Sequence, residues 1–133
     1  MQKRPLNEPL KEAIRASALG RVHVTGTGSA VGRFRFEEGF VGFRGHFPGR
    51  PLLPAVAQIT AALLVAGEVW GEAAVEAFSV DRAKFLLPIG PGAEIQVRCA
   101  RRDLAGGSEL SVRVDGEEGL AGSFTLTLGE AAP

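Results

Sequence analysis

The sequence predicts a single α+β domain in which an antiparallel sheet wraps around one apolar helix. The helix is expected over residues 55–67, where only Gln58 and Thr60 interrupt an otherwise apolar run. A helix that is apolar on nearly every side belongs in the interior of a protein. Three later segments alternate apolar and polar residues, as half-buried strands do, over residues 95–99, 110–115 and 123–128.

The first half of the chain predicts a surface helix followed by a hairpin. Residues 8–18 carry an apolar side chain at every fourth position, and Gly20 ends this amphipathic pattern. Two short strands are expected next, over residues 21–24 and 31–36, with a glycine-rich turn at 26–28 between them. In the second of these strands, alternation places Phe34 and Phe36 on one face of the sheet.

The remaining organisation follows from turn signals and length. Gly106-Gly107 and Asp115-Gly116 are strong hairpin signals between the last three strands. A chain of 133 residues is expected to form one domain, with an N-terminal helical segment over 1–20. Residues 129–133 are expected to form a flexible tail.

Composition excludes several classes of protein. Fifteen basic residues balance fifteen acidic ones, which argues against nucleic acid as a partner. No basic-then-apolar pattern opens the sequence and no apolar stretch reaches about 18 residues, so we expect neither a leader peptide nor membrane insertion, and a cytoplasmic location is the default expectation. The single cysteine, Cys99, has no partner for a disulfide or a metal and is expected to be a buried structural thiol. We expect neither a metal nor a cofactor.

The most informative stretch runs from Gly45 to Pro54 and contains His46 between glycines and prolines. Each proline fixes its own φ and restricts the residue before it, so this loop is stiff. Pro54 stands where a helix can begin, because the missing N–H costs least there. The stretch therefore predicts a histidine held on a rigid loop close to a helix N-terminus, where unpaired backbone N–H groups collect.

This stretch, GHFPGRPLLPAV, closely resembles the active-site loop of the FabZ/FabA-like β-hydroxyacyl-acyl-carrier-protein dehydratases. The segment VDRAKF at 80–85 and the glycine- and proline-containing turn after it resemble further parts of that family, so the resemblance covers roughly residues 30–128. The resemblance implies the hotdog fold, which agrees with the α+β layout. It also implies a homodimer or a higher even oligomer, because the family builds its site across paired subunits.

The resemblance implies removal of water from a 3-hydroxyacyl thioester carried by an acyl carrier protein, giving the trans-2-enoyl thioester in fatty acid or related biosynthesis. Such an elimination needs a base, a donor to the thioester carbonyl, and an acid for the departing hydroxyl. By resemblance, His46 is the base and the backbone N–H of Ala55 is the donor, at a position that is usually glycine in the family. Phe47, Pro54 and Gln58 are expected to contact the substrate.

The acid is missing from its usual place. In the family it is a glutamate or aspartate fourteen residues beyond the histidine, and this chain has Thr60 there. A hydroxyl cannot act as a carboxylic acid near neutral pH. Loss of a general acid costs about a hundred- to ten-thousandfold in rate. We therefore assign Thr60 to the catalytic position while treating activity itself as an open question.

Each of these assignments has a structural alternative. The role of His46 could be limited to capping backbone groups, and the Thr60 hydroxyl could donate to the carbonyl one helical turn earlier. Gln58, on a buried helix, is either a satisfied core amide or a wall of the site. Asp81 and Arg82 are interpreted as a pair on the surface of a strand.

The resemblance also implies which partners and which alternative functions to expect. Arg98, Arg101 and Arg102 cluster near one strand end and are either a solvated hairpin or a docking patch for the acidic acyl carrier protein. The alternative function is a weakly active or non-catalytic hotdog subunit that binds acyl chains or pairs with an active homologue, as Thr60 suggests. A hotdog thioesterase fits less well, because the His-Phe-Pro loop is typical of the dehydratases.

Overall fold

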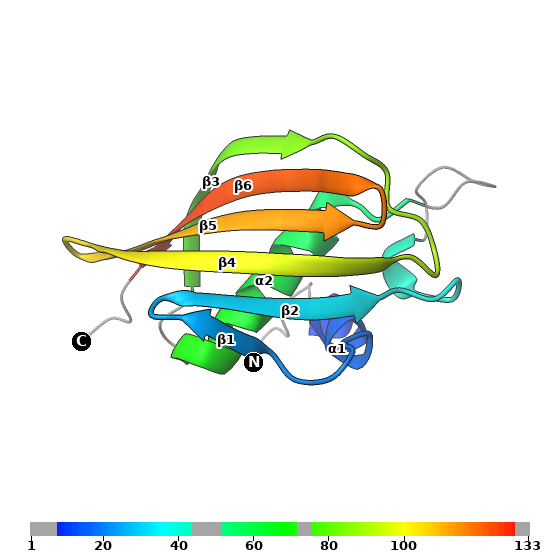
Figure 1. Cartoon of the computed structure of the whole chain (residues 1–133), viewed down its shortest axis with the longest axis horizontal. Helices are drawn as coiled ribbons and strands as arrows, with labels where there is room; N and C mark the ends of the chain where they lie inside the picture. Colours follow the sequence, from blue (N-terminus) through cyan, green and yellow to red (C-terminus); the bar gives the residue numbers. More distant parts are fainter. Residues whose placement is uncertain (1–7, 44–51, 72–75, 130–133) are drawn as a thin grey trace, which may run out of the picture.

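The computed structural model describes residues 8–43, 52–71 and 76–129. An antiparallel sheet of six strands, in the order β1-β2-β4-β5-β6-β3, curves over the helix α2, which crosses behind it in Figure 1. This arrangement confirms the α+β hotdog fold predicted from the sequence. The chain enters the sheet at one edge with β1 and β2, passes through α2, and returns at the opposite edge with β3.

The helices and strands occupy the following ranges. The helical elements are α1 (Glu8–Ala16), the 3₁₀ turn η1 (Val41–Phe43) and α2 (Ala55–Trp70). The strands are β1 (His23–Gly26), β2 (Ser29–Arg35), β3 (Glu76–Phe85), β4 (Glu94–Leu104), β5 (Gly107–Gly116) and β6 (Gly119–Gly129).

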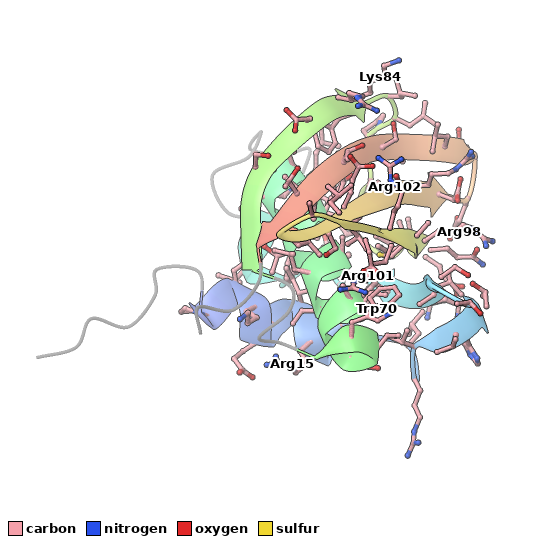
Figure 2. All side chains as sticks on the ribbon, turned by 90° about the vertical axis from the view of Figure 1, so that its left-hand side faces the viewer. Arg15, Trp70, Lys84, Arg98, Arg101 and Arg102 are labelled. Carbon is pink, nitrogen blue, oxygen red and sulfur yellow. The ribbon has the colours of Figure 1, made fainter. Side chains whose placement is uncertain are left out.

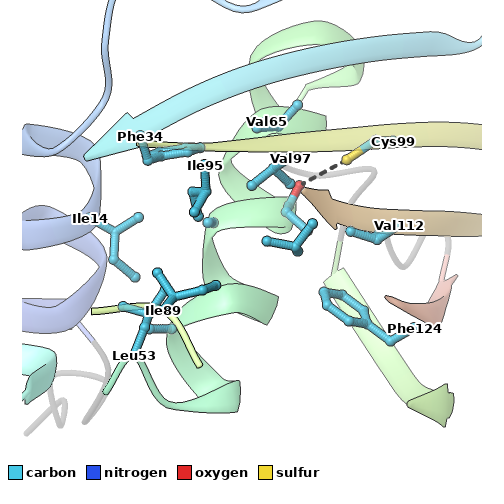
Figure 3. Packing of buried hydrophobic residues seen from close by; sticks show 14 of the residues in the cluster. Ile14, Phe34, Leu53, Val65, Ile89, Ile95, Val97, Cys99, Val112 and Phe124 are labelled. Carbon is cyan, nitrogen blue, oxygen red and sulfur yellow. Dashed lines mark hydrogen bonds between the residues drawn. The ribbon is translucent and has the colours of Figure 1, made fainter. Parts of the chain in front are cut away.

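The helix α2 lies close to the sheet because small side chains face it. Its buried residues include four alanines together with Val65. On β2, Gly32 faces this helix, and a Cβ placed there would lie 2.6 Å from Cγ2 of Val65. A larger residue at position 32 would therefore push the helix off the strand. Ile95 and Val97 of β4 fill the same layer, as alternation predicted (Figure 3).

An aromatic row closes the end of the core next to α1. Phe34 and Phe36 bury their rings on one face of the sheet, as the alternation of β2 predicted, and their ring centroids lie 6.0 Å apart. Phe40 packs on Phe36 at 4.6 Å, and Phe43 meets Phe40 edge-on at 5.5 Å. Successive ring contacts therefore hold the segment that follows β2, up to residue 43.

Element boundaries differ from the sequence expectations at several places, and the strand expected over residues 21–24 is β1 at His23–Gly26, which takes in Gly26 of the expected turn. The first helix ends at Ala16 rather than residue 18, because the backbone then turns to bridge β2 at Phe34. The helix α2 continues to Trp70 and ends at Gly71, whose φ of 91° favours glycine. The last strand runs through Gly129, which was expected in the tail, and the rest of the expected tail, residues 130–133, lies outside the described residues.

The final hairpin turn is also shifted from its expected place. Asp115-Gly116 belongs to β5 itself, and the two-residue connection is Glu117-Glu118, closed by the pairing of Gly116 with Gly119. Gly119 adopts a φ of 127°, which is a conformation open mainly to glycine. The turns at Gly28 and Gly106 lie where the sequence predicted them.

Among residues 8–43, 52–71 and 76–129, no helix combines the length and apolar character needed to cross a bilayer.

Candidate active site

The start of α2 presents backbone N–H groups without partners. Pro54 is the N-cap, in extended conformation, and no side chain caps the helix. Its carbonyl accepts hydrogen bonds from the amides of Ala57 and Gln58, at 3.0 and 3.3 Å. Within the described residues, the preceding amides of Ala55 and Val56 have no acceptor, and both residues are exposed. This is the geometry that an oxyanion donor requires.

Thr60 points its hydroxyl back along the helix. Its Oγ1 donates to the carbonyl of Val56 at 2.7 Å, one turn earlier, and the residue is 5% exposed. The back-bonding interpretation of Thr60 therefore describes its state in the isolated chain. The position itself is one turn beyond the unpaired amide of Val56, on the buried part of the helix.

Gln58 has a buried amide oxygen without a donor. The residue is 3% exposed, and its Oε1 has no hydrogen-bond partner among the described residues. The amide occupies space left by Gly122 of β6, where a Cβ would lie 2.9 Å from this oxygen and 3.2 Å from Cδ1 of Phe85. Of the two alternatives for Gln58, the satisfied core amide does not hold in the single chain. A buried acceptor left unpaired costs free energy, so a partner or a ligand is expected to supply a donor.

The segment that leads into α2 is anchored to the loop after β3. The amide of Leu53 donates to the carbonyl of Ile89 at 2.8 Å, and both side chains are buried. Pro54 is therefore held on both sides, by the hydrogen bond of Leu53 before it and by the hydrogen bonds that its own carbonyl accepts from α2. His46 and Phe47 lie outside the described residues.

The three arginines expected to dock a carrier protein are each paired with a carboxylate. Their ion pairs are Arg98 with Asp115 at 3.3 Å, Arg101 with Asp103 at 3.0 Å, and Arg102 with Glu109 at 2.9 Å. Arg101 also lies over the Trp70 ring, with 6.0 Å between Cζ and the ring centroid (Figure 2). Because its side chain is only 26% exposed, Arg101 belongs partly to the packing of the hairpin on α2. Arg98 and Arg102 remain more than half exposed.

Cys99 is a structural thiol, as the sequence predicted. It is 3% exposed, and its Sγ donates to the carbonyl of Ala62 at 3.8 Å across the interface of α2 with the sheet (Figure 3). Burial raises the pKa of this thiol from 9.0 to about 12. A group that holds its proton so strongly supplies no nucleophile at neutral pH.

Sequence reasoning assigns no role to a group of exposed apolar residues on β3, just after it and on the first turn of α2. Val80 and Phe85 of β3, Leu86 and Leu87 beyond it, and Val56 on the first turn of α2 are 39–56% exposed. Phe85 also packs on Phe124, with ring centroids 6.0 Å apart. Exposed apolar side chains of this size along β3, after it and on the first turn of α2 indicate surface that another chain or a ligand covers.

The fold is that of a hotdog protein, and comparison with known proteins identifies its family. The model of the ApeI-like family, described as ApeI dehydratase, matches residues 23–123. This chain therefore belongs to the ApeI-like dehydratase family.

Individual relatives and structures give the same result. The chain is 32% identical over 102 residues to a 3-hydroxyacyl-[acyl-carrier-protein] dehydratase of Granulibacter bethesdensis, covering 68% of this chain and 60% of that protein. The chain spans 52–62% of the length of the first three curated relatives it matches.

Two solved structures have the same fold. One is the dehydratase heterocomplex ApeI:P from Xenorhabdus doucetiae, with a TM-score of 0.71, 23% identity, and coverage of 85% of this chain and 96% of that one. The other is an uncharacterized protein from Erwinia carotovora subsp. atroseptica, with a TM-score of 0.68, 26% identity, and coverage of 85% and 94%.

Proposed function

We propose that this protein removes water from 3-hydroxyacyl thioesters to give trans-2-enoyl thioesters, with an acyl carrier protein as the preferred carrier. The observation that carries this proposal is the uncapped start of α2, a few residues after the His-Phe-Pro sequence at 46–48, in a chain of the ApeI-like family. The unpaired amides of Ala55 and Val56 suit the negative charge that develops on a thioester carbonyl. His46 is proposed as the base that removes the proton beside that carbonyl.

The departing hydroxyl must be protonated by a group other than a carboxylic acid at position 60. Thr60 is buried and donates its only proton to Val56, so in this state it offers an acceptor and no acid. We propose that it orders a water molecule, which passes to the departing hydroxyl the proton that His46 has taken from the substrate. The consequence is a slow dehydration compared with a site that holds a carboxyl group.

The test is incubation of the purified protein with a 3-hydroxyacyl carrier protein, followed by mass spectrometry of the carrier. Loss of one water, with the reverse hydration seen from the enoyl substrate, is the expected result. The same incubation with the coenzyme A thioester measures the carrier preference. No dehydration of either substrate by a folded protein would contradict the proposed activity.

Thr60 also favours a second candidate, a weakly active or non-catalytic subunit that pairs with an active homologue. One structure with the same fold was solved as the dehydratase heterocomplex ApeI:P, which is the kind of pairing that this candidate requires. A chain that is inert alone but raises the rate of a co-expressed homologous dehydratase would support this candidate.

We propose that two copies pair along β3, and we expect Val80→Glu to weaken this dimer by at least about tenfold. The edge strand β3 exposes backbone groups and apolar side chains, including Val80, which is 41% exposed. A charge buried in such an interface costs several kcal/mol. The measurement is the dissociation constant from analytical ultracentrifugation.

Val24→Glu is the matched control, because Val24 is a 66% exposed valine on the opposite edge strand β1. This variant should dimerise like the wild type. A dilute wild-type protein that stays monomeric, or a dimer lost in Val24→Glu and kept in Val80→Glu, would contradict the proposed interface.

A further inference from the structure

A cavity of about 440 Å³ lies at the edge of the molecule opposite β3. Its walls come from the end of α1, the segment before β1, the strand β2 and the C-terminal half of α2. Figure 1 shows α1, β1 and the C-terminal end of α2 together on this side of the molecule. Glu68 of the cavity lies about 12 Å along the helix axis from Thr60, so the cavity is distant from the residues proposed to hold the thioester.

The cavity forms where the pairing along this edge of the sheet is interrupted. Before the interruption, the amide of Leu19 donates to the carbonyl of Arg33 on β2, at 2.8 Å. After it, pairing resumes at His23, two residues earlier along β2. The three residues 20–22 therefore span a stretch where β2 contributes only Gly32. Irregular pairing of this kind is frequent at sheet edges and beside functional sites.

Apolar side chains line much of the cavity, and its size suits a small molecule. Phe34 and Val65 are buried, and Val22 and Leu64 are partly buried against the core. Binding sites for small molecules are typically about 300–1,000 Å³ in volume and mainly apolar, with a few polar groups that orient the ligand. The cavity therefore offers apolar contacts, and the charged side chains that line it decide which ligand binds.

Glu68 supplies a carboxylate that has no cation beside it among the described residues. Its Oε2 accepts a hydrogen bond from the amide of Val22 at 3.4 Å, and none of the ion pairs of the described residues includes it. Glu68 stands in the last turn of α2, which contains no basic residue. The C-terminal end of a helix carries partial negative charge, so a cation bound there is stabilising.

The two arginines that line the cavity have carboxylate partners other than Glu68. Arg15 pairs with Glu12, one turn earlier in α1, at 2.9 Å. Arg33 pairs with Glu94 on the neighbouring strand β4, at 3.4 Å. Glu68 is therefore the charge of this cavity that a ligand can neutralise.

We propose that the cavity binds a small organic cation in which an ammonium group is attached to an apolar chain. The ammonium group donates to the Glu68 carboxylate and offsets the negative end of α2. The chain packs against Val22, Leu64 and Val65. An apolar amine and an apolar amino acid share this chemistry, and the amino acid adds a carboxylate for which Arg33 is a cation in the same cavity. The site does not rest on the proposed dehydration, because none of these residues is assigned a part in that reaction.

Three ligands with one carbon skeleton test the ammonium group. Isoamylamine is leucine without the carboxylate, and isocaproate is leucine without the ammonium group. In NMR titrations of the whole protein, we expect isoamylamine and leucine to shift the resonance of the Val22 amide, which donates to Glu68. Isocaproate should bind at least about fivefold more weakly than isoamylamine, because it offers no cation to the carboxylate.

The outcomes of these titrations separate the proposal from its alternatives. Isocaproate that binds as tightly as isoamylamine, or shifts that leave the Val22 amide unchanged, would overturn the proposal. Tighter binding of leucine than of isoamylamine supports it and identifies an amino acid as the source of the ammonium group. The reverse order supports it and identifies an amine.

A series of linear amines tests the apolar walls of the cavity. Burial of each added methylene from ethylamine to butylamine should strengthen binding by about threefold. An affinity that does not rise with chain length would place the ammonium group on the open surface and contradict the proposed site.

Glu68→Gln removes the charge of the carboxylate at nearly constant size. Because Glu68 is exposed, we expect a moderate effect, with isoamylamine binding about fivefold more weakly. The matched control is Glu118→Gln, at an exposed glutamate in the turn between β5 and β6 that does not line the cavity, and it should change the affinity by less than about twofold. Equal weakening in both variants would reduce the effect to net charge and overturn the proposal. Thermal unfolding of each variant, measured in parallel, checks that it is folded.

Discussion

His46→Ala is expected to abolish dehydration, with a loss of about a hundred- to ten-thousandfold, while the midpoint of thermal unfolding stays within a few degrees. The imidazole is the only base in the motif that can remove the proton beside the thioester carbonyl, and a positioned general base contributes that much to the rate. The sequence predicts a loop at His46, where a side chain contributes little packing, so stability should change little. The measurement is the single-turnover rate by mass spectrometry of the carrier, with thermal unfolding followed in parallel.

The chain offers a matched control in its other histidine. His23 lies on the exposed edge strand β1, and His23→Ala should keep the wild-type rate. A His46→Ala protein that is folded and retains full activity would show that this histidine is structural and that the base lies elsewhere. A His46→Ala protein that fails to fold would be replaced in the test by His46→Gln, for which the same loss of rate is expected.

Much of the fold could be predicted because the spacing of apolar residues along the sequence follows from which side chains are buried. Ile95 and Val97 alternate with polar residues, and they are buried as alternation requires. The limits of α2 were harder, since Gly67 and Glu68 look like the end of a helix in the sequence. The helix continues because Val69 and Trp70 pack against the core. The final turn was misplaced because Asp115-Gly116 has strong turn propensity, whereas strand pairing extends β5 through it.

The site was predicted less completely, because its state depends on tertiary contacts. The sequence showed that Gln58 and Thr60 are polar groups on a buried helix, but it left open which of them finds a partner. Thr60 is satisfied locally, by a carbonyl one turn away, whereas Gln58 faces Gly122 on a strand that is distant in sequence. The register of the sheet also determines which charged side chains of the hairpin lie close enough to form ion pairs. Arg98, for example, is compensated by Asp115 of the neighbouring strand.

The same reasoning explains why the bulge in β3 could not be recognised from the sequence. Nothing in a run of alternating residues predicts that two residues of β3 will oppose one residue of β6. The bulge is visible only in the register of β3 with β6 and in the backbone dihedral of Arg82. The interpretation of Asp81 and Arg82 as a surface pair is wrong, since Asp81 instead accepts a hydrogen bond from Ser79 at 3.4 Å. A carboxylate without a cation, such as Glu68, can likewise be identified only once the ion pairs of the described residues are known.

Thr60→Glu is expected to raise the rate of dehydration by about ten- to a thousandfold over the natural protein, in the lower part of the usual range for a general acid. The substitution breaks the bond from Thr60 to the carbonyl of Val56 and places a carboxyl group one turn beyond the proposed oxyanion site. Position 60 is 5% exposed, and desolvation there should raise the pKa of the introduced carboxyl towards neutrality. The cost in stability should be about 1–3 kcal/mol, for a buried polar group with incomplete partners.

Thr60→Gln is the control for Thr60→Glu. Glutamine has nearly the same size and shape as glutamate, but it cannot donate the required proton. We expect no gain from this control. The gain in Thr60→Glu should disappear as the pH rises above the pKa of the introduced carboxyl, since only its protonated form can protonate the departing hydroxyl. A fast wild type that gains nothing from Thr60→Glu would place the acid on another residue. If both proteins are inert, the missing carboxyl is not the reason for inactivity, and the chain acts as a binding or pairing subunit instead.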